Sequence, residues 1–125
     1  MEEILVLTKR IGNIFHELRD LTTQMATALD RRDEVSVKML IAMRNEPIER
    51  LTIADRALRE HLTQLDEDEA QRIRAILNGD EASAVDPLEK ILAPQASMNI
   101  RAHSKLVELD KVINRKIAQD KSIYQ

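Results

Sequence analysis

The 125-residue sequence has no cysteine, only two glycines and three prolines, and one phenylalanine and one tyrosine as its aromatic residues. Without cysteine, disulfide bonds and thiolate chemistry are excluded. Sheet proteins favour aromatic residues and need turn glycines, so this composition argues against a β-sheet and suits long helices. The apolar runs are only a few residues long, far short of a membrane span. The first residues, MEEILVLTKR, begin acidic, which argues against a secretory signal and makes a cytoplasmic protein the simplest interpretation.

The sequence is instead rich in both apolar and charged residues, at 43% and 33% of the chain, with a formal net charge of −3. At this length it is expected to form one domain around a single core. We therefore predict a single all-α domain over residues 1–125. Its architecture should be an antiparallel helical bundle of three long helices with heptad-patterned apolar faces and one short helix.

The first thirty residues carry the most regular apolar pattern. Their apolar positions alternate by three and four without a break, which is a heptad seam that packs helix against helix at a shallow angle. Phe15 and Leu29 widen this stripe. The seam predicts a helix with one buried face, either in the core of an ordinary bundle or in a dimeric coiled coil. Its residues are Ile4, Leu7, Ile11, Ile14, Leu18, Leu21, Met25 and Ala28.

A charged turn, DRRDE at residues 30–34, separates this helix from a second one, and Asp33 is the predicted cap. The second helix contains Pro47, but its apolar stripe keeps the same phase on both sides of the proline. A helix that stopped and restarted would be free to change phase, so we predict one continuous helix kinked at Pro47. The alternative is a fresh start with Asn45 as the cap. The predicted inward stripe is Val37, Leu40, Ile41, Ile48, Leu51, Leu58, Leu62 and Leu65.

The second helix also carries apolar residues on roughly the opposite side, when they are placed at 100° per residue. A helix that is apolar on two sides is either central in its bundle or covered by a partner. Met39 and Met43 have flexible, polarizable side chains that adapt to varied surfaces, so they are candidates for partner binding as well as for core filling. This second face consists of Val35, Met39, Met43, Ile53 and Ala57.

A short third helix is predicted over about residues 67–78, and Gly79 ends it because glycine adopts the left-handed conformation at little cost. After a loop, Asp86, Pro87 and Glu89 supply a cap, a first-turn proline and a glutamate three residues past the cap, which together start a last helix. The short helix is expected to bury Ala70, Ile73, Ile76 and Leu77.

The last helix contains Pro94, which either kinks it or marks a restart near Ala93. Ile100 and Val107 project from a different side than the main stripe. They are candidates for a partner surface, or else isolated exposed apolar groups. The predicted inward stripe is Leu88, Ile91, Leu92, Met98, Ala102, Leu106, Leu109, Ile113 and Ile117.

No motif for catalysis or metal binding accompanies these helices. His16, His61 and His103 stand alone, without the Glu-x-x-His pairs of di-iron bundles or an HExxH sequence. Glycine-rich phosphate loops and Gly-x-Ser-x-Gly elbows are also missing. The sequence therefore predicts no enzyme, no cofactor and no metal site. Its negative net charge and few aromatic residues argue against nucleic-acid binding and membrane insertion.

Residues 28–51, ALDRRDEVSVKMLIAMRNEPIERL, resemble flagellar type III export chaperones of the FlgN and FliT kind. In that family a heptad-patterned first helix ends in a short charged turn with an aspartate. A long second helix follows and carries a basic residue before an apolar pair, here Arg44 before Ile48 and Leu51. The long last helix with an asparagine in it and the terminal DKSIYQ also resemble the family.

The resemblance implies a small cytoplasmic chaperone that binds and protects flagellar hook-associated or filament-cap subunits before export, without catalysis or cofactor. It also implies that the last helix, over residues 98–124, contacts the client. The alternative is a homo-oligomeric helical scaffold or a regulatory adaptor without catalysis, and a homodimer is open in either case. The candidate partner-binding residues are Met39, Met43, Ile100, Val107, Ile123 and Tyr124.

Overall fold

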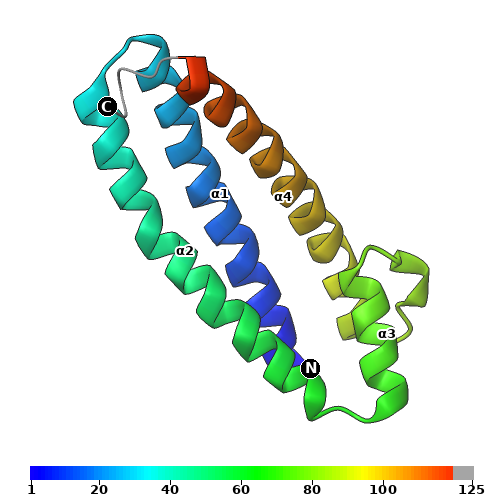
Figure 1. The fold of residues 1–125 in the computed structure, drawn as a ribbon. Helices are drawn as coiled ribbons and strands as arrows, with labels where there is room; N and C mark the ends of the chain where they lie inside the picture. Colours follow the sequence, from blue (N-terminus) through cyan, green and yellow to red (C-terminus); the bar gives the residue numbers. More distant parts are fainter. Residues whose placement is uncertain (120–125) are drawn as a thin grey trace.

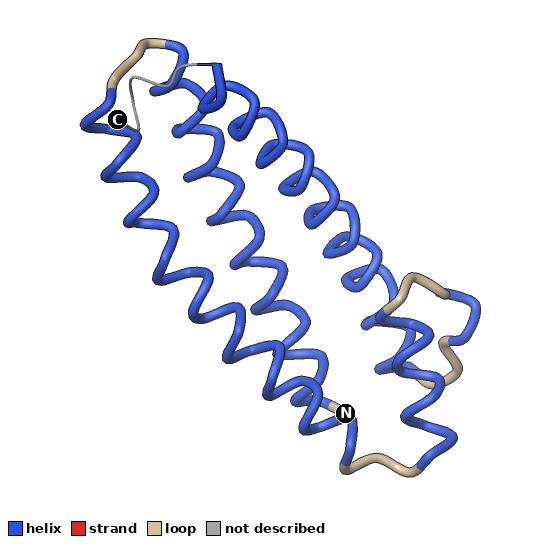
Figure 2. The backbone as a smooth tube through the Cα atoms, viewed as in Figure 1, coloured by secondary structure: helices blue, strands red, loops and turns tan. Residues whose placement is uncertain are grey.

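A computed structural model describes residues 1–119, and Figure 1 shows them as an elongated bundle of helices. The three long helices are α1 (Glu2–Asp30), α2 (Glu34–Thr63) and α4 (Pro87–Gln119). Between α2 and α4 come the short helix α3 (Glu67–Leu77) and a single 3-10 turn, η1 (Glu81–Ser83). Figure 2 shows helices and connecting loops throughout this part of the chain. The predicted all-α class, with three long helices and one short helix, is confirmed.

The central helix of the bundle is α1. It packs along both α2 and α4, whereas α2 and α4 scarcely touch each other. Figure 1 shows α2 running antiparallel to both other long helices. Every residue of the heptad seam predicted for α1 is buried, and so are Phe15 and Leu29. Because α2 and α4 of the same chain cover this seam, it belongs to a bundle core, and no second copy is needed to cover it.

The buried side chains form two clusters along the bundle, the larger toward α3 and the smaller toward the turn between α1 and α2. At the level where the clusters meet, Arg44 of α2 forms an ion pair with Asp110 of α4, with 3.3 Å between Nη2 and Oδ1. Arg44 Nη1 also donates to the sulfur of Met25 at 3.9 Å. This ion pair links α2 directly to α4 and fixes which residues of the two helices face each other.

Helix α2 continues through Pro47 without interruption, so the predicted continuous helix is confirmed and the alternative start at Asn45 is wrong. One predicted inward residue, Ile48, is 42% exposed, while the rest of the predicted stripe is buried or half-buried. The prediction failed at Ile48 because the neighbouring proline takes the inward heptad position. The buried residues of α2 are Val37, Leu40, Pro47, Ala54, Leu58 and Leu62.

Replacing Pro47 with alanine should raise the free energy of unfolding by about 1 kcal/mol. An interior proline destabilises a helix by about 3 kcal/mol, and alanine restores the missing backbone hydrogen bond. Part of this gain is offset because the buried proline ring is removed, and each buried methylene contributes about 0.8 kcal/mol to stability. The control is Pro94→Ala in α4, where the proline is exposed and the gain should be larger. Urea denaturation measures both, and a Pro47→Ala variant less stable than wild type would contradict this balance.

Helix α4 likewise continues through Pro94. Its inward face differs from the predicted one at Ile91 and Met98, which are each 49% exposed. The small residues Ala93 and Ala96 are buried instead. The distance between packed helices depends on the side chains at the contact, so these alanines let α4 approach the core closely. The larger side chains of Ile91 and Met98 then lie at the side of α4, partly exposed to solvent.

The helix boundaries carry the predicted caps. Asp33 accepts a hydrogen bond from the backbone N–H of Ser36 at 3.1 Å, and the hydroxyl and N–H of Ser36 together lower the pKa of the Asp33 carboxyl. Gly79 has a φ of 104°, in the left-handed region that ends α3. Asp86 accepts from the backbone N–H of Glu89 at 2.8 Å. The last two caps set where α3 ends and α4 begins, and these segments form one end of the site described below.

Candidate functional site

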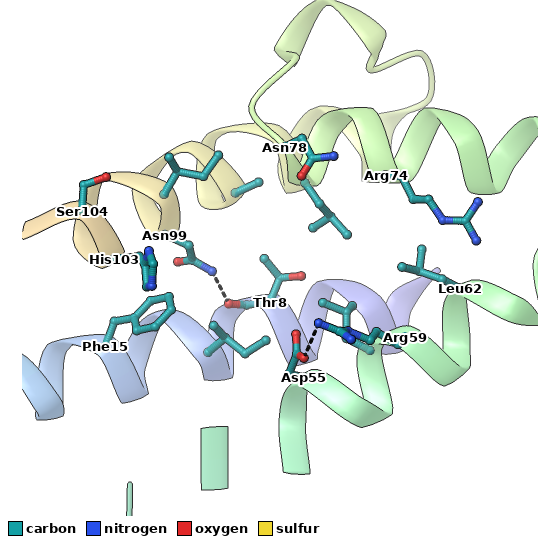
Figure 3. A pocket seen from close by; sticks show the side chains of 15 residues that line it. Thr8, Phe15, Asp55, Arg59, Leu62, Arg74, Asn78, Asn99, His103 and Ser104 are labelled. Atoms are coloured by element: carbon teal, nitrogen blue, oxygen red, sulfur yellow. Dashed lines mark hydrogen bonds and ion pairs between the residues drawn. The ribbon is translucent and has the colours of Figure 1, made fainter. Parts of the chain in front are cut away.

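A groove of about 480 Å³ opens between α2 and α4, with α1 as its floor and the end of α3 as a wall (Figure 3). We call it the α2–α4 groove. It is lined by Thr8, Ile11 and Phe15 of α1, by Asp55, Leu58, Arg59 and Leu62 of α2, by Arg74, Leu77 and Asn78 at the end of α3, and by Ala96, Asn99, Ile100, His103 and Ser104 of α4.

The groove exists because α2 and α4 both pack along α1 but make little contact with each other. Some of the core side chains beneath it keep a little exposure to solvent. Phe15 is 9% exposed and Leu58 is 8% exposed, whereas Leu92 is 0% exposed. The three long helices thus leave open the side of α1 that a fourth helix would cover in a four-helix bundle.

An amide pair fixes α4 against α1 beside the floor of the groove. Asn99 Nδ2 donates to the backbone carbonyl of Thr8 at 2.8 Å, and Asn99 Oδ1 accepts from Gln95 Nε2 at 2.9 Å. Gly12 makes room for both amides, because a Cβ atom there would stand 2.6 Å from Asn99 Oδ1 and 2.8 Å from Gln95 Nε2. The α4 edge of the groove is therefore held at a defined distance from its floor.

The two ends of the groove differ in character. Toward the middle of the bundle, the ring of Phe15 packs against the ring of His103, with centroids 5.6 Å apart. Toward α3, Arg74 of α3 and Arg59 of α2 are both exposed, and Arg59 Nη2 lies 3.1 Å from Asp55 Oδ2 in an ion pair. Figure 3 shows the aromatic pair at one end of the view and the arginines toward the other. The groove therefore has an apolar floor, an aromatic end and a basic end.

A buried carboxylate holds the α3 wall in place. Glu89 of α4 is 0% exposed, and its two oxygens accept hydrogen bonds from Arg72 Nε and Nη2 of α3, each at 3.3 Å. Glu89 Oε1 also accepts from the backbone N–H of Val85 at 3.1 Å. These hydrogen bonds raise the pKa of the Arg72 guanidinium, and the backbone N–H of Glu89 lowers the pKa of the Asp86 carboxyl. The sequence identified Glu89 as part of a helix start, but no spacing in it links Glu89 to Arg72 on another helix.

One of the predicted partner-binding residues lines this groove, and a second lies beyond it on the same face of α4. Ile100 lines it and is 40% exposed, and Val107 follows one heptad further along α4 at 38% exposed. Because α2 is antiparallel to α4 and Arg44 meets Asp110, Ile48 lies on the facing edge at about the level of Val107. Ile48 was expected in the core, so sequence reasoning missed it as a surface residue.

Met39 and Met43 do not belong to this groove. They are 55% and 49% exposed, so they do not fill the core. Met39 lines a separate hollow between α1 and α2, together with Gln24 of α1. At 100° per residue, Gln24 lies half a turn around α1 from Phe15, which is on the floor of the α2–α4 groove. The structure therefore places the methionines apart from the outward pair on α4.

The other two predicted partner-binding residues, Ile123 and Tyr124, lie outside the described residues. Within residues 1–119, no three histidine, aspartate or glutamate side chains gather closely enough to hold a metal ion. None of the helices in this range combines the length and apolar character that a bilayer span requires.

Fold and groove together define the class of protein: an all-α bundle whose three long helices leave a groove with an apolar floor over residues 8–15 of the central helix. In comparisons with known proteins, no family model matches the chain, and neither a curated protein nor a solved structure matches it. The groove is consequently the feature from which a function can be argued.

Proposed function

We propose that this chain is a cytoplasmic export chaperone whose α2–α4 groove binds an amphipathic helix of a flagellar hook-associated or filament-cap subunit before type III secretion. The observation that carries the proposal is the apolar floor left open on the side of α1 that a fourth helix would cover. A client helix bound there would complete a four-helix bundle, which is the helix-in-groove mode of recognition.

The length and lining of the groove suit a helix. The lining residues of α2 run from Asp55 to Leu62, an advance of about 11 Å at 1.5 Å per residue, which is the length of about two helical turns. Beyond it the same face of α4 continues with an exposed apolar side chain at heptad spacing, since Val107 follows Ile100 by seven residues. Helix-in-groove contacts use anchors at such spacings.

The choice of a flagellar client is supported by the resemblance of residues 28–51 to export chaperones. The small, acidic, all-helical chain also has the character that this resemblance implies. The role requires no catalysis, because the chaperone acts by covering an apolar helix of the client until export. It places the chain in the cytoplasm, where export substrates are held.

A variant carrying Ile100→Ser and Val107→Ser should bind its client at least about tenfold more weakly, since a loss of about 1.4 kcal/mol of apolar contact has this effect. Its free energy of unfolding should change little, because exposed substitutions usually stay within about 0.5 kcal/mol. The probes are purified peptides that cover the terminal segments of the hook-associated and filament-cap proteins encoded in the same genome. Calorimetric titration of wild type and variant measures the affinities.

The matched control is Met39→Ser with Met43→Ser, which removes two exposed apolar side chains from the other side of the bundle and should leave the affinity unchanged. If no peptide binds the wild-type chain, the proposed function is wrong. If binding is lost in the methionine variant and kept in the α4 variant, the client binds the outer face of α2.

A homo-oligomeric scaffold is the second candidate, and one observation favours it. The outer face of α2 exposes a row of apolar side chains, with Val35 at 78%, Met39 at 55% and Ile53 at 58%. Such a row is the kind of surface that a second copy of the chain could cover. Sedimentation equilibrium tests the scaffold: a dimer abolished by Met39→Ser and Ile53→Ser supports it, and a monomer contradicts it.

A further inference from the structure

We infer that the helix bound in the α2–α4 groove carries an acidic side chain at the end that lies against α3, where it pairs with Arg74. This inference rests on the proposed function, because it specifies the chemistry of the partner that the groove binds. It also fixes the orientation of that partner, since only one end of the groove carries the cation.

The charges around the groove differ from those of the chain as a whole. The formal net charge of the chain is −3, yet the charged residues that line the groove are one aspartate and two arginines. Asp55 is paired with Arg59 at 3.1 Å. Among residues 1–119, Arg74 has no ion-pair partner. Its neighbour Arg72, by contrast, is bound to the buried Glu89. One cation at the α3 end of the groove is therefore left uncompensated.

A helix seated in the groove would take part of the Arg74 side chain out of water. An unpaired charge is unfavourable when it is desolvated, so an apolar partner residue beside Arg74 would weaken binding. A carboxylate there would replace the hydrogen bonds to water that Arg74 loses. The guanidinium can donate two parallel N–H hydrogen bonds to its two oxygens.

The geometry of the groove gives the partner's acid a defined position. Figure 3 shows Arg74 reaching from α3 toward Leu62 of α2, at the end of the groove away from Phe15 and His103. The floor between these ends is apolar and includes the buried side chains of Ile11, Phe15, Leu58 and Leu62. A partner that fits both features is an amphipathic helix with apolar anchors along one face and an aspartate or glutamate at one end of that face.

The test uses the client peptide that binds the wild-type chain most tightly, with each of its acidic residues replaced in turn by the matching amide and by lysine. On the wild-type chain, one amide replacement should weaken binding about fivefold, as expected for the loss of a partly desolvated ion pair. On an Arg74→Glu chain that same replacement should no longer weaken binding. The lysine peptide should bind Arg74→Glu more tightly than it binds the wild-type chain, because the pair is then restored with reversed charges.

The matched control is Arg56→Glu, which makes the same change of net charge at an exposed position of α2 that does not line the groove. Its affinity for the unmodified peptide should stay within about twofold of wild type. The effect of Arg74→Glu should also shrink at high salt, because salt screens interactions between exposed charges.

The outcomes separate this inference from the function on which it rests. If Arg74→Glu binds the unmodified peptide like wild type while Ile100→Ser with Val107→Ser weakens binding, the acidic partner residue is wrong and the groove remains the site. If no client peptide binds the wild-type chain, the proposed function and this inference are both wrong.

Discussion

Replacing Glu89 with alanine is expected to lower the free energy of unfolding by about 3 kcal/mol. Breaking a buried ion pair costs about 3–5 kcal/mol, and the loss here falls at the low end because the surviving Arg72 side chain is 38% exposed and can regain water. The backbone N–H of Val85 also loses its acceptor. Since Glu89 ties α3 to the start of α4, the α3 wall of the groove should loosen with it.

Urea denaturation measures the loss, and hydrogen exchange should show faster exchange of the amides in residues 67–77. The matched control is Glu108→Ala, an exposed glutamate on the same helix, which should change stability by less than about 0.5 kcal/mol. A Glu89→Ala variant as stable as the control would mean that the apolar contacts of Ile73 and Ile76 alone hold α3 in place.

The second large effect is expected from Ile113→Ser, which should lower the free energy of unfolding by about 4 kcal/mol. Ile113 is 3% exposed and belongs to the smaller core cluster. Large-to-small core replacements cost about 2–5 kcal/mol, and a buried hydroxyl adds to this unless it finds a partner.

The comparison for this variant is Val107→Ser on the same helix, a β-branched residue that is 38% exposed. Thermal unfolding of the two should differ widely, with Val107→Ser close to wild type. Equal losses in the two variants would show that Val107 contributes to the core, and its place on the outward face of α4 would then be wrong.

Much of this fold could be predicted from local pattern. The α1 seam is regular enough to define its buried face, and Asp33 and Gly79 mark boundaries that the structure confirms. The continuity of α2 followed from the phase of its stripe across Pro47. The pattern does not define every single inward position, because two adjacent residues can both fit a heptad stripe. At residues 47 and 48, for example, the buried residue is Pro47 and the exposed one is Ile48.

The groove could be predicted only in part. Ile100 and Val107 were identified as outward from their angle on the helix, and both are exposed. The groove itself depends on how far α2 and α4 stand apart, and this separation arises from contacts between distant segments. Examples are the Arg72–Glu89 pair and the amide of Asn99 on the Thr8 carbonyl. No periodicity within one helix encodes such pairings.

Nuclear magnetic resonance of the isotope-labelled chain, titrated with its tightest-binding client peptide, tests most directly whether the α2–α4 groove is the partner site. Chemical-shift changes should concentrate in residues 55–62 of α2 and 96–104 of α4, with contacts between peptide protons and the methyl groups of Ile100. Changes confined to the outer face of α2 around Met39 and Met43, with the groove residues unaffected, would contradict the assignment.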